Sequence, residues 1–388
     1  MAKTIVNIVT EDDPISAYLF IKEMFQEGDR LMYISAKDTE YDMVYLDEID
    51  GVPTESIVVL LKEDTDAFCY EKICRTVKAY LQEGVHYCVN LAGGTRYMAL
   101  AVQQVFERFD SEFFYVHVKD NVIIKSIYDD SIYDDDDSYF PISYRMTIQE
   151  YLTAHGMHSD LKRKGHTPIR SEEDAKYLFY LFSEDLLGPC GLEILDILRK
   201  FYRCKNKVAI QGIISPQLEE DEPIPDIVNF LAYLHFTPQN PELLTKEELE
   251  YLTGGWFEEY VYYMMKRELN PDDIAIGVKI YTKGVKRQNE LDVVFTKGNK
   301  FYVVECKTGV QTESIFNEIV YKACALKEAL LGVSCLFHIC TLRKDNNGEW
   351  GRIAKNMDIE YMDFECMTTE SLLKEKLSSM KEKSKDVK

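Results

Sequence analysis

Glu290-Leu291-Asp292-Val293-Val294-Phe295 is followed, after five residues, by Phe301-Tyr302-Val303-Val304-Glu305-Cys306-Lys307-Thr308. Both segments are short, apolar and rich in Val and aromatic residues, which is typical of strands buried in a sheet. The intervening residues include Gly298 and Asn299, the residue types that accept the positive φ of a tight turn. The pattern predicts a β-hairpin that is almost entirely apolar.

The few polar residues of this hairpin gather at one end. Glu305 and Lys307 are two residues apart and therefore share one face of the strand, and the hairpin brings Asp292 to the same end. Charges at the rim of an apolar sheet are costly without partners. A divalent cation, Mg²⁺ or Mn²⁺, would be such a partner for Asp292, Glu305 and the backbone carbonyl of Cys306. The alternative is an edge hairpin with a Lys–Glu surface pair.

This arrangement predicts metal-dependent cleavage of phosphodiesters. The metal would polarise a phosphoryl oxygen and generate hydroxide from bound water. Lys307 would orient or deprotonate the attacking water, or stabilise the pentacoordinate phosphate.

A helix upstream offers a further carboxylate. Thr245 and Glu248 form a capping-box pattern that predicts a helix start, and the helix is expected to stop near Gly254-Gly255. A new helix is expected from Trp256, with Glu258 or Glu259 projecting from its first turn toward the strand ends. The spacing does not choose between them. Alternatively, the pair is solvent-facing and favoured by the helix dipole.

Three segments in order resemble the PD-(D/E)xK nuclease core found in restriction endonucleases. They are the Gly-Gly-Trp-Phe-Glu run ending at Glu258, residues 289–292, and residues 305–308. The resemblance implies an active site made of Glu258, Asp292, Glu305 and Lys307. Leu291 stands where the family usually has Pro.

The N-terminal part alternates predicted strands and helices. Strands are expected at residues 4–10, 57–62, 85–91 and 113–118, and helices at residues 15–25, 70–83 and 97–109. This order predicts a parallel, doubly wound sheet, which binds ligands at the carboxyl ends of its strands. Gly93-Gly94-Thr95 lies at such an end and opens a helix, so its N–H groups suit an anion. The alternative is a strand-to-helix turn without a ligand.

The segment from Asn90 to Met98 resembles the second motif of CARF domains, the Rossmann-like sensors of cyclic oligoadenylates. The place of their first motif is held here by residues 10–14. The resemblance implies a ligand site formed by Thr10, Glu11, Asp12, Gly93, Gly94, Thr95, Arg96 and Met98. The family's usual Thr and Lys are Ala92 and Arg96 here.

Both motifs in one chain resemble the CRISPR-associated CARF nucleases of type III antiviral immunity. The resemblance implies an α/β chain with a CARF domain at residues 1–148, a helical connector at 149–240 that transmits the state of the sensor, and a restriction-endonuclease-like domain at 241–388. It also implies a homodimer that cyclic tetra-adenylate activates to cut single-stranded DNA and RNA, and it leaves nicking of duplex DNA open. The alternatives are a ligand-independent restriction-type endonuclease and a non-catalytic nucleotide-sensing regulator.

Composition constrains the partners. The 388 residues carry a net charge of −22, which opposes the approach of nucleic acid. Basic residues nevertheless surround the predicted hairpin: Lys279, Lys283, Lys286, Arg287, Lys297 and Lys300. We expect a local groove suited to flexible single-stranded nucleic acid.

The 10 cysteines form no C-x-x-C pair, and the close pair His155 and His158 lacks nearby cysteines, so no zinc site is expected. Without a leader or membrane span, a cytoplasmic protein is expected.

Overall fold

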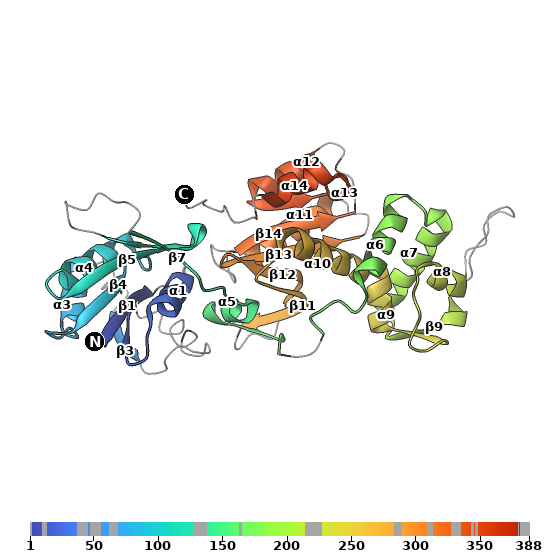
Figure 1. Cartoon of the computed structure of the whole chain (residues 1–388). Coiled ribbons are helices and arrows are strands. Elements are labelled where there is room, and N and C mark those ends of the chain that lie inside the picture. Colours follow the sequence, from blue (N-terminus) through green and yellow to red (C-terminus); the bar gives the residue numbers. More distant parts are fainter. Residues whose placement is uncertain are drawn as a thin grey trace.

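The computed structural model describes residues 2–9, 14–36, 46, 56–61, 69–126, 138–162, 165–213, 227–282, 289–308, 313–326, 335–342, 345, 348–378 and 380. Two sheet-containing bodies and a group of helices lie in a row (Figure 1). The predicted ligand residues Thr10, Glu11 and Asp12 lie outside the described residues. The same is true of Lys283, Lys286 and Arg287 from the predicted basic groove.

The N-terminal sheet has seven strands in the order β3-β2-β1-β4-β5-β6-β7. Their bounds are β1 Lys3–Val9, β2 Arg30–Ala36, β3 Ser56–Leu61, β4 His86–Asn90, β5 Ser111–His117, β6 Val122–Lys125 and β7 Tyr139–Pro141. Strands β1 to β5 pair in parallel, and β6 and β7 are antiparallel additions at one edge. The predicted doubly wound sheet is confirmed, whereas β2, β6 and β7 were not predicted from the sequence.

Helices cover both faces of this sheet. Ile5 and Val9 of β1 belong to the core on one face, which is covered by α1 (Pro14–Met24). Val6 and Ile8 belong to the core on the other face, which is covered by α3 (Tyr70–Lys78) and α4 (Arg96–Phe106). This division follows from the period of two along a strand, which sends successive side chains to opposite faces.

The C-terminal sheet has six strands in the order β15-β14-β13-β12-β11-β8. Their bounds are β8 Met157–Ser159, β11 Asp273–Thr282, β12 Asn289–Lys297, β13 Lys300–Lys307, β14 Cys335–Thr341 and β15 Ile359–Met362. β12 and β13 form the predicted hairpin, and Gly298 and Asn299 in its turn have φ of 55° and 61°. β13, β14 and β15 are parallel to one another.

The remaining helices follow the N-terminal sheet along the chain. They are α5 Ile148–Ala154, α6 Glu172–Ser183, α7 Gly188–Cys204, α8 Ile227–Tyr233, α9 Lys246–Glu250, α10 Trp256–Leu269, α11 Glu313–Leu326, α12 Glu349–Asn356, α13 Phe364–Thr368 and α14 Glu370–Ser378. A small antiparallel pair joins β9 (Lys207–Ala209) to β10 (Leu243–Thr245). Within the described residues, none of the helices combines the length and apolar character needed to cross a membrane.

Helices α6, α7 and α8 do not lie between the two sheets. They lie beyond the C-terminal sheet, on the side away from the N-terminal domain (Figure 1). Leu178, Ile194 and Phe230 from these helices share one core with Trp256 and Phe257 of α10. The middle of the chain is helical, as predicted, but these three helices are not the part of residues 149–240 that lies between the domains, because sequence order does not fix which packed element is the neighbour in space.

The two sheets meet through α5, which forms the start of the predicted connector. The ring of Tyr151 in α5 stacks on Phe301 of β13, with ring centroids 4.6 Å apart. The hydroxyl of Tyr18 in α1 donates a hydrogen bond of 2.6 Å to Glu150 of α5. One hydrophobic core therefore continues from α1 through α5 into the C-terminal sheet.

Candidate active site and anion-binding turn

The hairpin brings three of the four predicted catalytic residues together. Its register sets Val293 opposite Val304, so Asp292 and Glu305 lie beside each other. The Cys306 N–H donates a 2.7 Å hydrogen bond to Asp292 Oδ2. Lys307 Nζ lies 2.8 Å from Glu305 Oε1 and 3.3 Å from Asp292 Oδ2. The ammonium group thus contacts both carboxylates.

Burial and the neighbouring charges together set the charge states in this group. Burial, with the nearby charge of Glu305, raises the pKa of Asp292 to about 6. Burial by itself raises the pKa of Glu305, but the ammonium groups of Lys307 and Lys322 offset this and hold it below its ordinary value. Burial by itself lowers the pKa of Lys307, yet Asp292 and Glu305 raise it above its ordinary value. Lys307 is therefore a cation, which favours charge stabilisation over proton abstraction.

The two helix carboxylates point to different surroundings. Glu259 Oε1 accepts a hydrogen bond of 2.6 Å from the Ile169 N–H, and Glu259 Oε2 accepts one of 3.3 Å from the Arg170 N–H. Glu258 instead interacts electrostatically with Asp292 and Lys307, and burial together with Asp292 raises its pKa to about 9. Glu258 therefore faces the hairpin. We call Glu258, Asp292, Glu305 and Lys307 the carboxylate–lysine cluster.

A π-helical turn positions Glu258. Residues Tyr251–Gly255 form this turn and connect α9 to α10 without a gap, so the helix break expected at Gly254-Gly255 is wrong. The Thr308 hydroxyl donates a 3.1 Å hydrogen bond to the carbonyl of Thr253 in the turn. This bond fastens the helix to the end of β13. Single π-helical turns occur frequently at functional sites.

Lys322 is a member of the site that was not predicted from the sequence. It lies on α11, and its Nζ is 3.4 Å from Glu305 Oε1. No local motif marks this lysine, because it reaches Glu305 only through the packing of α11 over β13. Its ammonium group places a second positive charge beside the Glu305 carboxylate.

The donor atoms of the cluster fit a hard divalent cation. Asp292 and Glu305 offer carboxylate oxygens, and the Cys306 carbonyl lies beside them and accepts a 3.0 Å hydrogen bond from Lys307 Nζ. An all-oxygen set suits Mg²⁺ or Mn²⁺. Side-chain exposures of 14% for Asp292 and 8% for Glu305 mean that two carboxylates are held nearly dry beside each other. A cation would stabilise that arrangement.

The turn after β4 has a structural reason for its glycines. A Cβ on Gly93 would lie 1.7 Å from the Ile8 carbonyl oxygen of β1. Gly94 has φ of +76°, and a Cβ there would lie 2.4 Å from Ile8 Cγ2. The Thr95 hydroxyl caps α4 by accepting a 3.1 Å hydrogen bond from the Met98 N–H. This close approach explains the glycines whether or not an anion binds.

The side chains beside this turn divide into exposed and buried ones. Arg96 is exposed at the first position of α4, whereas the side chain of Met98 is fully buried in the core. The buried side chain of Asn90 connects the ends of β1 and β4. Its Nδ2 donates a hydrogen bond of 3.0 Å to Asn7 Oδ1, and its Oδ1 accepts one of 3.0 Å from the Ala92 N–H. The Asn90–Asn7 pair was not predicted from the sequence, because only the parallel pairing of β1 and β4 brings the two residues together.

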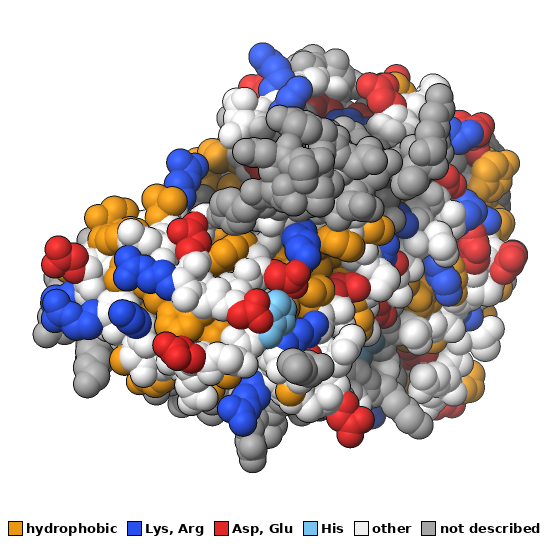
Figure 2. Space-filling view, turned by 60° about the vertical axis from the view of Figure 1, so that its left-hand side comes forward, with side chains coloured by type: hydrophobic (Ala, Val, Ile, Leu, Met, Phe, Trp, Pro, Cys, Tyr) orange, Lys and Arg blue, Asp and Glu red, His pale blue; other side chains and the backbone are white. Residues whose placement is uncertain are grey.

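Charge is mixed on the face of the molecule in Figure 2. Acidic and basic side chains lie beside one another around a histidine, and no continuous stretch of one sign stands out among the residues drawn in colour. Such a face offers little general attraction to a nucleic-acid backbone.

Family models decide the relationship of the chain. The model described as the Card1 CARF domain matches residues 4–151, and the model described as the Card1-like endonuclease domain matches residues 245–363. The chain therefore carries a CARF domain and an endonuclease domain of the Card1 type. The predicted CARF domain and the predicted nuclease domain are therefore both confirmed. No curated protein matches this CARF endonuclease.

Solved structures share the fold of the CARF endonuclease. VC1899 from Vibrio cholerae has a TM-score of 0.70 at 17% identity, covering 97% of each chain. Can2 from Sulfobacillus thermosulfidooxidans, solved in complex with cyclic tetra-adenylate, has a TM-score of 0.71 at 19% identity, covering 97% of this chain and 98% of Can2. A type III CRISPR defence DNA nuclease activated by cyclic oligoadenylate has a TM-score of 0.53 at 13% identity, covering 97% of this chain and 52% of that one.

Proposed function

We propose that this CARF endonuclease is a metal-dependent nuclease of type III CRISPR defence, active as a homodimer, that cyclic tetra-adenylate switches on to cut single-stranded DNA and RNA. The observation that carries the proposal is the nearly dry carboxylate–lysine cluster in an endonuclease domain that shares one core with a CARF domain. The likeness to Can2, which was solved with cyclic tetra-adenylate, supports the choice of activator.

Each residue of the cluster has a proposed task. Asp292, Glu305 and the Cys306 carbonyl would hold Mn²⁺ or Mg²⁺, which when bound polarises the phosphoryl oxygen and lowers the pKa of water. Lys307, held as a cation by its two carboxylate neighbours, would stabilise the charge that develops on the phosphate. Glu258 would complete the site from α10.

The proposed ligand site uses mainly backbone groups. The N–H groups of Gly93, Gly94 and Thr95 at the start of α4 would bind phosphate, and exposed Arg96 would pair with it. The CARF resemblance adds Thr10, Glu11 and Asp12 as proposed ligand residues. Because the side chain of Met98 is buried, its contribution would be limited to the backbone. A two-fold axis between two CARF domains would let each subunit bind half of a cyclic tetranucleotide.

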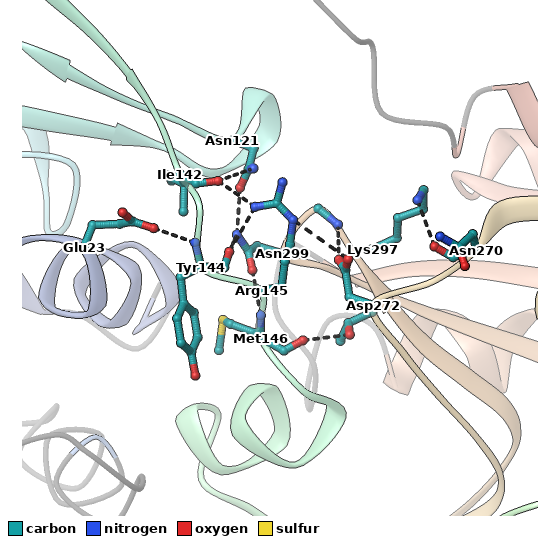
Figure 3. A network of polar contacts seen from close by, with 12 residues as sticks. Glu23, Asn121, Ile142, Tyr144, Arg145, Met146, Asn270, Asp272, Lys297 and Asn299 are labelled. Carbon is teal, nitrogen blue, oxygen red and sulfur yellow. Dashed lines mark hydrogen bonds and ion pairs between the residues drawn. The ribbon is translucent and has the colours of Figure 1, made fainter.

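A network of polar contacts supports a route from the CARF domain to the nuclease centre (Figure 3). Asn299, in the turn of the β12–β13 hairpin, donates through Nδ2 to Asn121 Oδ1 at 2.7 Å and to the Tyr144 carbonyl at 2.9 Å. Its Oδ1 accepts a hydrogen bond of 2.9 Å from the Met146 N–H. The same hairpin carries Asp292 and Glu305 at its other end, so a shift of the CARF domain would reach them along one rigid element.

Further contacts hold the same turn. The Thr296 hydroxyl donates a hydrogen bond of 2.7 Å to the Met146 carbonyl, and Asp272 Oδ2 accepts one of 2.8 Å from the Gly298 N–H.

We propose that residues 1–148 form the sensor domain and residues 241–388 the nuclease domain. Residues 149–240 are the proposed helical connector that transmits the state of the sensor: α5 packs against both sheets, and α6, α7 and α8 share a core with α10.

Asn299→Gly tests this route, because glycine keeps the positive φ of the turn and removes the amide. We expect cyclic tetra-adenylate to bind this variant normally but to stimulate cutting about tenfold less than in the wild type, the usual size of an allosteric coupling. Stimulation equal to that of the wild type would place the route elsewhere.

The function itself is tested by cleavage of labelled single-stranded DNA, single-stranded RNA and supercoiled plasmid, with Mn²⁺ or Mg²⁺, each with and without cyclic tetra-adenylate. We expect cutting only when both metal and cyclic nucleotide are present. Cutting without the nucleotide would favour a ligand-independent restriction-type endonuclease. No cutting with any cyclic oligoadenylate would favour the non-catalytic regulator.

A further inference from the structure

A histidine, a cysteine and a glutamate from two neighbouring strands meet in the CARF domain, at the sheet end opposite the Gly93-Gly94 turn. His86 and Cys88 lie two residues apart near the start of β4 and therefore share one face of the sheet. Glu112 of β5 is paired directly opposite Cys88. No zinc site was expected from the sequence, because spacing along the chain does not reveal the register between strands.

The donor atoms form a compact triangle. Cys88 Sγ lies 3.9 Å from His86 Nε2 and 4.0 Å from Glu112 Oε2, and His86 Nε2 lies 3.5 Å from Glu112 Oε2. A tetrahedral Zn²⁺, with bonds of about 2.3 Å to sulfur and about 2.0 Å to nitrogen and oxygen, requires donor separations of about 3.3 to 3.6 Å. The triangle needs to contract by only about half an ångström.

Neighbouring groups leave these three atoms pointing at one another. Asp110 Oδ2 lies 3.1 Å from His86 Nδ1, on the opposite edge of the imidazole ring from Nε2. Lys125 Nζ pairs with Glu112 Oε1, which leaves Oε2 toward Cys88 and His86. A carboxylate on the second nitrogen of a histidine is the usual support of a metal-bound imidazole, since it fixes the ring and the tautomer.

We propose that His86 Nε2, Cys88 Sγ and Glu112 Oε2 bind a divalent transition-metal ion of the zinc class, with water as the fourth ligand. The thiol proton of Cys88 leaves to solvent on binding, so that thiolate and carboxylate together balance the charge of the ion. A thiolate and an imidazole select zinc over Mg²⁺ or Ca²⁺, which prefer oxygen. This site is chemically distinct from the all-oxygen donor set of the carboxylate–lysine cluster.

The exposure of the three residues suits an ion that arrives from solvent. The cysteine is 1% exposed, whereas the side chains of His86 and Glu112 are 34% and 36% exposed. An ion there would join β4 to β5 at one end of β4, while the other end of β4 leads into the Gly93-Gly94 turn. The expected effect of the ion is to stabilise the CARF sheet, with no part in cutting nucleic acid.

Cobalt titration of the full-length, chelator-treated protein tests the proposal. Co²⁺ bound by a thiolate gives an intense sulfur-to-metal charge-transfer band, which oxygen donors at the nuclease centre cannot give. We expect this band to saturate at one ion per chain and to disappear when Zn²⁺ displaces the cobalt, since zinc binds such sites more tightly. Absence of the band from folded wild-type protein would overturn the proposal.

Variants assign the band to this cluster. Cys88→Ala should abolish it, whereas the matched variant Cys74→Ala, which removes a different CARF cysteine, should retain it. Asp110→Asn should weaken cobalt binding by about 10- to 100-fold, because it removes the support of the imidazole. If Cys88→Ala fails to fold, Glu112→Gln provides the test through reduced affinity for cobalt. A full-strength band in Cys88→Ala, or unchanged affinity in Glu112→Gln, would show that the thiolate ligand lies elsewhere.

Discussion

The carboxylate–lysine cluster and the Gly93-Gly94 turn owe their chemistry to different parts of their residues. In the cluster, the carboxylates of Asp292 and Glu305 are held almost dry at the end of an apolar hairpin, paired with the partly exposed ammonium group of Lys307. In the turn, the useful groups are backbone N–H groups, and the glycines are already required by the close approach of Ile8. A costly group without a packing role points to function more strongly than a residue that the fold itself needs.

The largest expected effect comes from the cluster. Lys307→Ala removes the ammonium group that contacts both carboxylates, and we expect cleavage to fall on the order of a hundredfold to a thousandfold, the usual cost of losing one electrostatic stabiliser. Cleavage rates at saturating metal and cyclic tetra-adenylate measure this. Lys355→Ala, an exposed lysine on α12 of the same domain, is the matched control and should retain most activity. Equal losses in the two variants would contradict a specific role for Lys307.

The two helix glutamates separate catalysis from structure. Glu258→Gln should slow cutting about a hundredfold with little change in stability, because Glu258 faces Asp292. Glu259→Gln should mainly lower the melting temperature, because the hydrogen bonds from Ile169 and Arg170 lose a charged acceptor. Paired measurements of rate and melting temperature decide between them. The reverse pattern would exchange their assignments.

A smaller effect is expected at the ligand turn. Arg96→Ala should raise the concentration of cyclic tetra-adenylate needed for half-maximal cutting about tenfold, since one charge-assisted contact to phosphate is lost. The cutting rate at saturation should stay that of the wild type. Arg108→Ala, another arginine of the CARF domain, should change neither quantity. A lower rate at saturating ligand in Arg96→Ala would mean that Arg96 does more than bind.

The smallest effect concerns stability and uses two glycines with nearly the same φ. Gly94 (+76°) is crowded by Ile8, whereas a Cβ on Gly84 (+78°) would meet open space, with no described atom within 4 Å. Alanine at either site strains the backbone, but Gly94→Ala also overpacks the core, which costs about 1–3 kcal/mol more. Denaturant unfolding of both variants measures the difference. Equal losses would show that Ile8 yields and that the glycine is not needed for packing.

The hairpin and the capping box of Thr245 and Glu248 could be predicted because their signals are local. Short apolar runs rich in Val and aromatic residues, a Gly-Asn turn, and Thr followed by Glu three residues later each indicate the local backbone over a few residues. Lys322, the placement of α6 to α8, and the His86–Cys88–Glu112 cluster could not be predicted. Each depends on which strands and helices become neighbours in space, and a single sequence leaves that register open.

The continuous helix before Glu258 escaped prediction for another reason. Gly254-Gly255 looks like a helix end, since glycine is a poor helix former. In the structure the chain continues through a π-helical turn that Thr308 holds in place. Tertiary contact here overrides the local preference, at the point where the helix has to place Glu258 against the hairpin.

The most direct test of the division between cutting and sensing uses Glu305→Ala. Calorimetry would give its affinity for cyclic tetra-adenylate, and cleavage of labelled single-stranded DNA with Mn²⁺ and saturating nucleotide would give its rate. We expect wild-type affinity for the cyclic nucleotide with no detectable cutting, because the carboxylate–lysine cluster cleaves the nucleic acid and the Gly93-Gly94 turn binds the cyclic nucleotide. Cutting at the full wild-type rate would contradict the assignment of the active site.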